Sequence, residues 1–182
     1  MLQETELIGK AKNGDVEAFQ NLILAYQEKI YSFAFYLAKN QQDASDLSQE
    51  TWVKVFKQLS SFRLDSSFYT WVCRILRNLF IDHHSRIPHK RPEVSLNDEL
   101  DSNIPQLGIL EQIEQQHRDD VVADAVSRLP DEFRSTIVLV DMQGLSYEEA
   151  AKITDVSINT VRSRLSRGRE RLRAYFEKAG TF

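Results

Sequence analysis

Residues 144–173 place two helices and a short turn next to one another, and they constrain the fold more than any other stretch. They read GLSYEEAAKITDVSINTVRSRLSRGRERLR. Ser146 and Glu149 have the spacing of a capping box, which closes the first turn of a helix. Ser157 is a second cap candidate, for a helix running from about Ile158 to Lys178. A capped helix, a tight turn and a longer second helix predict a helix-turn-helix.

The second of these helices separates apolar from polar residues. At about 100° per residue, one narrow arc collects an apolar set that we expect to be buried. Short polar residues and one arginine lie opposite, where they suit base edges, and arginines line both flanks, where they suit phosphates. A solvated surface helix would explain a lone arginine-rich helix more simply, but this one follows a capped helix and a turn. The apolar arc is Val161, Leu165, Gly168 and Leu172.

Composition narrows the class of protein. The chain has 182 residues, of which 42% are hydrophobic, and a net charge of −4. This acidic total predicts that contact with DNA is confined to local basic patches. Cys73 is the only cysteine, so no internal disulfide can form, and we expect a buried apolar residue there. No signal peptide or apolar run of ~20 residues is present, so we expect a cytoplasmic protein without membrane insertion.

The chain divides into three blocks. The first is helical almost throughout and has no strand signals. Next comes an acidic stretch containing Pro88, Pro92 and Pro105, which is typical of a linker. The third block is helical again, with Pro130 starting a helix over Glu132–Met142. We therefore predict an all-α fold of two small helical domains, at residues 1–90 and 117–182, joined by a flexible acidic linker at 91–116.

Within the first block, two helices carry polar groups beside aromatic residues. A helix over Asp43–Leu59 has an apolar side that includes Trp52 and Phe56. A serine-rich connection leads to a second helix, which starts at Phe68 and has basic and amide residues on its outer side. Cations beside aromatic rings favour single-stranded nucleic acid. We expect most of the aromatics to be core residues, with Phe62 and Tyr69 the two that packing explains least.

Three segments together resemble a known family. They are DASDLSQETWVKVFKQLSSF, SSFYTWVCRILRNLFIDHHSR and LPDEFRSTIVLVDMQGLSYEEAAKITDVSINTVRSRLSRGRERLR. In this order they resemble the bacterial extracytoplasmic-function sigma factors of the sigma-70 family, over nearly the whole chain. At Val72, Cys73 and His83 the chain differs from the residues that family members often carry. These differences are small, and they bear on promoter preference rather than on membership in the family.

The resemblance implies three sets of site residues. Those expected to bind RNA polymerase are Asp46, Gln49, Glu50, Trp52 and Phe56. Those expected to bind the melted −10 element are Phe62, Arg63, Leu64, Asp65, Ser66, Ser67, Arg74, Arg77, Asn78, Asp82 and Arg86. Those expected to read the −35 element in duplex DNA are Asn159, Thr160, Arg162, Ser163, Arg164 and Arg167.

The same resemblance implies the partners. They are core RNA polymerase, promoter DNA and an anti-sigma factor, and the free chain is expected to be a monomer with no cofactor. Transcription chemistry would belong to the polymerase, so we expect no enzymatic activity and no catalytic residue.

The sequence allows two other interpretations. A stand-alone helix-turn-helix regulator would bind operator DNA as a dimer, but the first block lacks the signature of a sensor or dimerisation domain. A metal site could involve His83, His84, His89 and Cys73, yet their spacing fits no common ligand pattern. We therefore expect no bound metal.

Overall fold

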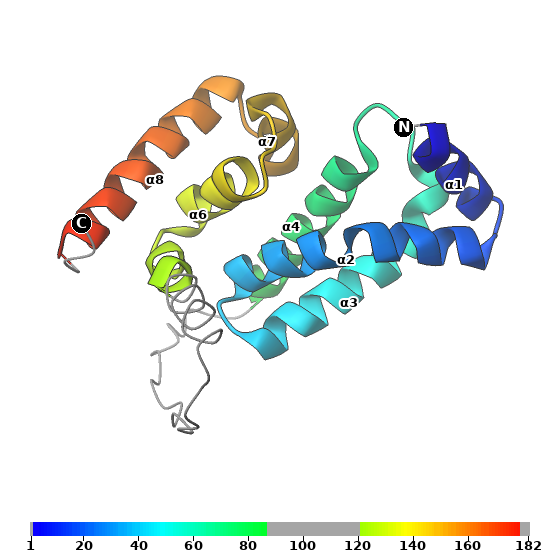
Figure 1. The fold of residues 1–182 in the computed structure, drawn as a ribbon, viewed down its shortest axis with the longest axis horizontal. Coiled ribbons are helices and arrows are strands. Elements are labelled where there is room, and N and C mark those ends of the chain that lie inside the picture. Colours follow the sequence, from blue (N-terminus) through cyan, green and yellow to red (C-terminus); the bar gives the residue numbers. More distant parts are fainter. Residues whose placement is uncertain (1, 87–120, 179–182) are drawn as a thin grey trace, which may run out of the picture.

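The computed structural model describes residues 2–86 and 121–178, with side chains at 4–83 and 121–178, and these ranges contain helices and no strand. The predicted all-α fold of two helical domains is confirmed (Figure 1). The first domain contains α1 (Leu2–Lys12), α2 (Val16–Ala38), α3 (Gln41–Gln58), the 3-10 turn η1 (Leu59–Ser61) and α4 (Phe68–Arg86). The predicted linker, residues 91–116, lies outside the described residues.

Polar caps fix where the helices of the first domain begin. The side chain of Asp15 accepts a hydrogen bond from the Ala18 amide at 3.0 Å, and that of Asn40 accepts from the Asp43 amide at 2.8 Å. Lys39, with φ of 69°, ends α2 in the left-handed conformation. The Ser67 hydroxyl accepts from the Thr70 amide at 3.1 Å at the start of α4. Each cap satisfies a backbone donor that its helix leaves unpaired.

The second domain begins with a helix at 121–127 and continues through α6 (Asp131–Ile137), the π-helical turn η2 (Val138–Met142), α7 (Tyr147–Thr154) and α8 (Ile158–Lys178). The sequence predicted one helix over Glu132–Met142. The structure is helical there, but its last turn is wider, because the Gln143 amide donates to the Val138 carbonyl five residues back, at 3.0 Å. Periodicity alone does not distinguish an α-turn from a π-turn.

The predicted buried face of α8 is confirmed. Val161 and Leu165 are fully enclosed, Gly168 is buried and Leu172 is partly buried against the core. A Cβ atom at Gly168 would lie 2.9 Å from Cγ1 of Ile137 on α6. Only a residue without a side chain therefore lets α6 and α8 approach this closely.

The two domains contact one another, with α7 packing on α4 and α6 packing on α2. In Figure 1, α4 lies on the side of the first domain nearest α6 and α7. As a result α4 is buried on more sides than the single apolar stripe that the sequence predicted. The predicted stripe comprises Phe68, Trp71, Val72, Ile75 and Leu79, and the additional buried residues are Tyr69, Thr70, Leu76 and Phe80.

The expectation that packing would explain Phe62 and Tyr69 least is wrong. Phe62 is 1% exposed, and its ring lies 4.9 Å from that of Trp71, centroid to centroid. Lys12 on α1 donates to the Phe62 carbonyl at 2.7 Å, which closes the connection over the core. Tyr69 stacks on Tyr26 and is 7% exposed. Phe62 is buried because the connection folds back between α1 and α4, whereas Tyr69 is buried between Tyr26 of α2 and Gln143 of the second domain. Helical periodicity shows neither arrangement.

Candidate nucleic-acid interface

The helix-turn-helix is built by the caps that the sequence predicted. The Ser146 hydroxyl accepts from the Glu149 amide at 3.2 Å, and the Glu149 carboxylate accepts from the Ser146 amide at 2.9 Å. Asp155, with φ of 54°, ends α7, and the Ser157 hydroxyl accepts from the Thr160 amide at 3.1 Å. Three residues thus turn the chain from α7 into α8, whose first turns point into solvent.

The Glu149 carboxylate links the capping box to acid stability. The hydrogen bond from the Ser146 amide is the main cause that holds the pKa of Glu149 below its usual range. A lowered folded-state pKa contributes stability above the unfolded pKa, about 4.5, and that stability is lost as the pH falls through the folded pKa. We therefore expect Glu149→Ala to lower the free energy of unfolding by about 1 kcal/mol at pH 7.

Urea unfolding of parent and variant at pH 7 and pH 3 measures this effect. The difference between parent and Glu149→Ala should shrink at the lower pH. The neighbouring exposed Glu148→Ala is the control, and an equal effect at both positions would contradict the capping role.

The predicted −35 residues lie together on the first half of α8. Asn159, Arg162, Ser163 and Arg167 are exposed. Thr160 and Arg164 are only partly exposed, and Arg164 lies 3.8 Å from the Glu132 carboxylate on α6. The structure therefore offers one continuous polar surface with three arginines, of which Arg164 is held against its own domain.

Two further arginines on α8, both exposed, make contacts within their own domain. Arg169 donates to both oxygens of Asp141, at 2.9 and 2.6 Å, and this carboxylate raises the pKa of Arg169. Arg171 lies over the ring of Phe133, 5.1 Å from its centroid. The sequence placed both on the phosphate-facing flanks of α8. In the structure these contacts tie α8 to α6 and η2.

The predicted −10 loop is exposed apart from its first residue. Arg63, Leu64, Asp65 and Ser67 are exposed and Ser66 is half-buried, whereas the Phe62 ring is enclosed and offers no face to a base. Leu64 has φ of 60° and is 54% exposed. A non-glycine residue in this region costs about 1 kcal/mol or more and often marks a functional site. Leu64 is therefore the apolar group that the loop presents to solvent.

On α4, the predicted −10 residues Arg74, Asn78 and Asp82 are exposed. Arg77 is half-buried, and burial, followed by the charge of Arg164, lowers its pKa. The backbone of Arg86 ends α4, and its side chain lies outside the described side chains. The domain contact thus brings an arginine of the −10 set close to one of the −35 set.

A cavity of about 350 Å³ lies between α3 and α4, beside this surface. Its lining adds an ammonium and a primary amide, from Lys54 and Gln58, to the amide of Asn78. Sequence reasoning did not assign Lys54 and Gln58 to the −10 set. Their position on the polar side of the α3 pattern was a signal, but only the packing of α4 shows that they face Asn78.

The predicted polymerase-binding residues lie along α3. Asp46, Gln49 and Glu50 are exposed, and Trp52 is half-buried. Phe56 is 54% exposed and touches the edge of Phe19, although the sequence placed it on the apolar side of this helix. Val53, next to it, is 53% exposed. A carboxylate-bearing helix with adjoining exposed apolar side chains suits a protein partner.

The histidine and cysteine positions give no metal-binding cluster within the described residues. His83 lies 2.9 Å from Glu50, whereas the side chain of His84 and all of His89 lie outside what the structure describes. Cys73 is fully buried, as predicted, and burial raises its pKa to about 12. Among the described helices, none has the length and apolar content needed to cross a bilayer.

Comparison with known proteins covers both domains. The Sigma-70 region 2 family matches residues 22–87, and the Sigma-70, region 4 family matches residues 119–172. The RNA polymerase sigma-H factor of Pseudomonas aeruginosa is 33% identical, over 92% of this chain and 91% of its own length. The ECF RNA polymerase sigma factor SigW of Bacillus subtilis is 32% identical, over 91% and 92%. This chain belongs to the extracytoplasmic-function sigma factors.

Solved structures agree with this membership. The sigma factor RpoE of Bartonella quintana, in complex with the anti-sigma factor NepR, is 28% identical and has a TM-score of 0.68, over 89% of this chain and 98% of RpoE. CnrH, in complex with the cytosolic domain of CnrY, has a TM-score of 0.71 at 24% identity, over 97% and 98%, and shows the shared fold. The stand-alone regulator is not supported, because the first domain matches a sigma region as well.

Proposed function

We propose that this sigma factor binds core RNA polymerase and directs transcription from promoters by recognising a −35 element in duplex DNA and a melted −10 element. One observation carries the proposal. A single chain presents a basic reading helix on its second domain and, on its first, a polar loop with a cavity beside it and a separate acidic helix. Each surface suits one of the three contacts that such a subunit makes.

For the −35 element, we propose the six residues of α8 named above, of which the exposed Arg167 lies furthest along the helix. We expect Arg167→Ala to weaken binding to a −35 duplex by about 1 to 3 kcal/mol if the guanidinium contacts a base. Binding to core polymerase should not change, because Arg167 lies on the other domain from α3. Fluorescence anisotropy with matched and scrambled −35 duplexes measures the loss.

Two outcomes would count against this role for Arg167. An equal loss on both duplexes would assign it to phosphate contact. A simultaneous loss of polymerase binding would indicate misfolding.

For the −10 element, we propose that the exposed loop residues, together with Arg74, Arg77, Asn78, Asp82 and Arg86, hold the unpaired strand. Extruding a base costs a few kcal/mol of stacking, so a pocket that rewards one base turns this cost into specificity. The cavity beside Asn78 offers amide and ammonium groups for a base edge. Leu64 supplies an exposed apolar side chain close by in sequence.

For the polymerase, we propose the exposed groups of α3, with Trp52 and Phe56 beside them. We expect Asp46→Ala combined with Gln49→Ala to weaken binding to core polymerase about tenfold or more, as truncated central interface residues commonly do. Binding to an isolated −35 duplex should be unchanged. The control is Glu6→Ala with Lys10→Ala, which removes an exposed ion pair on α1.

Native-gel titration of core polymerase against each variant separates these outcomes. If the control weakens polymerase binding as much as the α3 variant, then α3 is not the docking helix.

We also propose domain limits of 1–90 and 117–182 with a linker at 91–116, a monomeric free chain, and no catalytic activity or cofactor of its own. An anti-sigma factor is a further proposed partner, since RpoE of Bartonella quintana, a relative in fold and sequence, was solved with one.

The decisive experiment is run-off transcription with purified core polymerase on genomic fragments, followed by mapping of start sites. The proposal requires that adding this protein creates specific starts. Absence of any specific start, with a protein that binds polymerase, would overturn it.

A further inference from the structure

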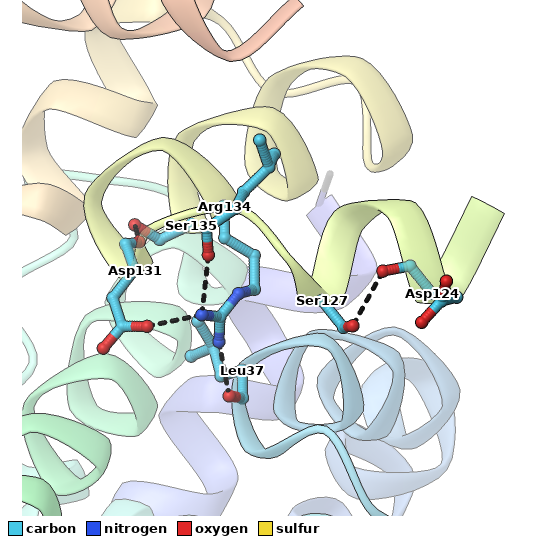
Figure 2. Close-up of polar contacts among 7 residues, drawn as sticks. Leu37, Asp124, Ser127, Asp131, Arg134 and Ser135 are labelled. Atoms are coloured by element: carbon cyan, nitrogen blue, oxygen red, sulfur yellow. Dashed lines mark hydrogen bonds and ion pairs between the residues drawn. The ribbon is translucent and has the colours of Figure 1, made fainter. Parts of the chain in front are cut away.

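Arg134 is one of the largest side chains that the fold buries completely, with 1% of it exposed. It belongs to α6, but its guanidinium reaches the other domain. One terminal nitrogen, Nη1, donates to the carbonyl of Leu37 on α2 at 2.9 Å. The other, Nη2, donates to the Leu129 carbonyl at 2.9 Å and to the Asp131 carboxylate. Figure 2 shows the side chain extended between Asp131 and the Leu37 carbonyl.

The Leu37 carbonyl is an acceptor that its own helix leaves open. It lies in the last turn of α2, whose final four carbonyls have no partner within the helix. The C-terminal end of a helix also carries partial negative charge, which favours a cation. Arg134 therefore acts as a cap for α2 that is supplied by the second domain, 97 residues away in sequence.

This buried cation is only partly compensated. Burial lowers the pKa of Arg134, and its Nε atom is enclosed without a hydrogen-bond partner among the described residues. Lys39 lies close by, and burial, followed by the charge of Arg134, lowers its pKa too. Arg134 thus pairs with a single carboxylate, that of Asp131, while Lys39 adds a second positive charge nearby. An apolar pair would fill such a contact at least as stably. The arginine therefore makes a contact between the domains that is easier to separate, which suits a contact that has to open.

A second group of bonds closes the same domain contact at the start of α4. The Tyr69 hydroxyl donates to the Gln143 side-chain carbonyl at 2.6 Å. The side-chain amide nitrogen of Gln143 donates to the backbone carbonyl of Lys29 at 3.1 Å. The Thr70 hydroxyl donates to the Glu149 carboxylate at 3.2 Å. These bonds hold α7 against α4 and the end of η2 against α2, and α4 carries the half-buried Arg77.

The position of Arg77 near Arg164 conflicts with the proposed use of the two arginines. Arg77 belongs to the −10 set and Arg164 to the −35 set, so each has to reach a different segment of DNA. In the closed arrangement Arg77 is instead half-buried, and its guanidinium is close enough to that of Arg164 for the two like charges to repel.

We propose that Arg134 is a latch that holds the two domains of the free chain closed, and that this closed arrangement withholds Arg77 from promoter DNA until the domains separate. The contacts alone support the latch. Only the second part of the proposal, that the closed arrangement withholds Arg77 from DNA, rests on the proposed function.

The latch is tested by distances between nitroxide labels in the full chain. Ala25→Cys on α2 and Ala174→Cys on α8 provide exposed labelling sites, and the native Cys73 is fully buried. In the parent we expect one narrow distance distribution by pulsed electron paramagnetic resonance. Arg134→Met and Arg134→Lys should both broaden it toward longer distances, because neither side chain can donate to Leu37 and Leu129 at once.

Arg128→Met is the matched control, since Arg128 is exposed and pairs with Asp124 within its own domain at 3.0 Å. Its distance distribution should match the parent. A narrow, unchanged distribution in either Arg134 variant that keeps the far-ultraviolet circular dichroism of the parent would overturn the latch. Loss of helicity in both variants would also overturn it, because Arg134 would then be a core residue of the second domain.

The withholding is tested separately by affinity for a promoter fragment that carries both elements with a pre-melted −10 segment, without polymerase. The opened variant should bind more tightly, by about tenfold if about a tenth of the parent is open. Longer label distances without tighter binding would keep the latch and reject the withholding. If neither parent nor variant bound the fragment above a scrambled one, the proposed DNA contacts themselves would fail.

Discussion

Phe62→Ala should destabilise the first domain by about 3 to 5 kcal/mol, the usual loss for removing an enclosed phenyl ring. The ring is 1% exposed and packs against Trp71 and Phe68, at centroid distances of 4.9 and 5.8 Å. Its removal leaves a cavity between η1 and α4, the two elements that the −10 loop connects. Urea unfolding followed by circular dichroism measures the change.

The control for Phe62 lies two residues further along the same loop. Leu64→Ala removes a side chain that is 54% exposed, so its effect on unfolding should stay within about 0.5 kcal/mol. Binding to pre-melted −10 DNA should nevertheless fall in this variant. If Phe62→Ala kept full stability while losing DNA binding, Phe62 would be a DNA contact and its place in the core would be wrong.

Gly168→Leu should destabilise the second domain by about 3 kcal/mol, because overpacking of a tight helix contact typically costs this much. Even a bare Cβ at this position would lie 2.9 Å from Cγ1 of Ile137, which is 2% exposed. Because α6 supports the reading helix through this contact, binding to a −35 duplex should weaken as well. Thermal unfolding and duplex affinity of the variant measure both effects.

A double-mutant cycle separates the contact from helix propensity. Gly168→Ala alone should destabilise, since the clash outweighs the gain of about 1 kcal/mol from replacing glycine in a helix. Ile137→Ala removes Cγ1 and Cδ1, the two carbons that would lie 2.9 and 3.1 Å from the new Cβ. In this background the same Gly168→Ala change should become neutral or stabilising. A change of the same sign and size in both backgrounds would show that Ile137 is not the limiting neighbour.

Local patterns in the sequence were sufficient for the helix-turn-helix of the second domain. The Ser146 and Glu149 capping box, the break at Asp155 and the cap at Ser157 depend on residues within three positions of one another, so short-range chemistry decides them. The buried arc of α8 also follows from helical periodicity. Gly168 signalled a close helix approach, although the neighbour, Ile137, became known only from the fold.

The site residues divide in a similar way. Sequence motifs placed the −35 set on one helix, and the structure shows it as one surface. The roles of all three sets remain predictions. The sequence placed Phe56 on the apolar side of a helix and Phe62 in the polar connection, but their exposures of 54% and 1% depend on what packs around them. Only the packing of α4 beside α3 shows that Lys54 lines the same cavity as Asn78 of the −10 set.

The sequence by itself determined the all-helical class, the caps of the helix-turn-helix, the two domains and the family, because each rests on residues close together in the chain or on motifs in a fixed order. Tertiary structure alone decided how the domains meet. Arg134 bonds to Leu37, and Gln143 to Lys29, across 97 and 114 positions. No periodicity encodes a partner at that distance. The bond to Leu37, which offsets part of the cost of burying the guanidinium, forms only when the end of α2 lies beside it.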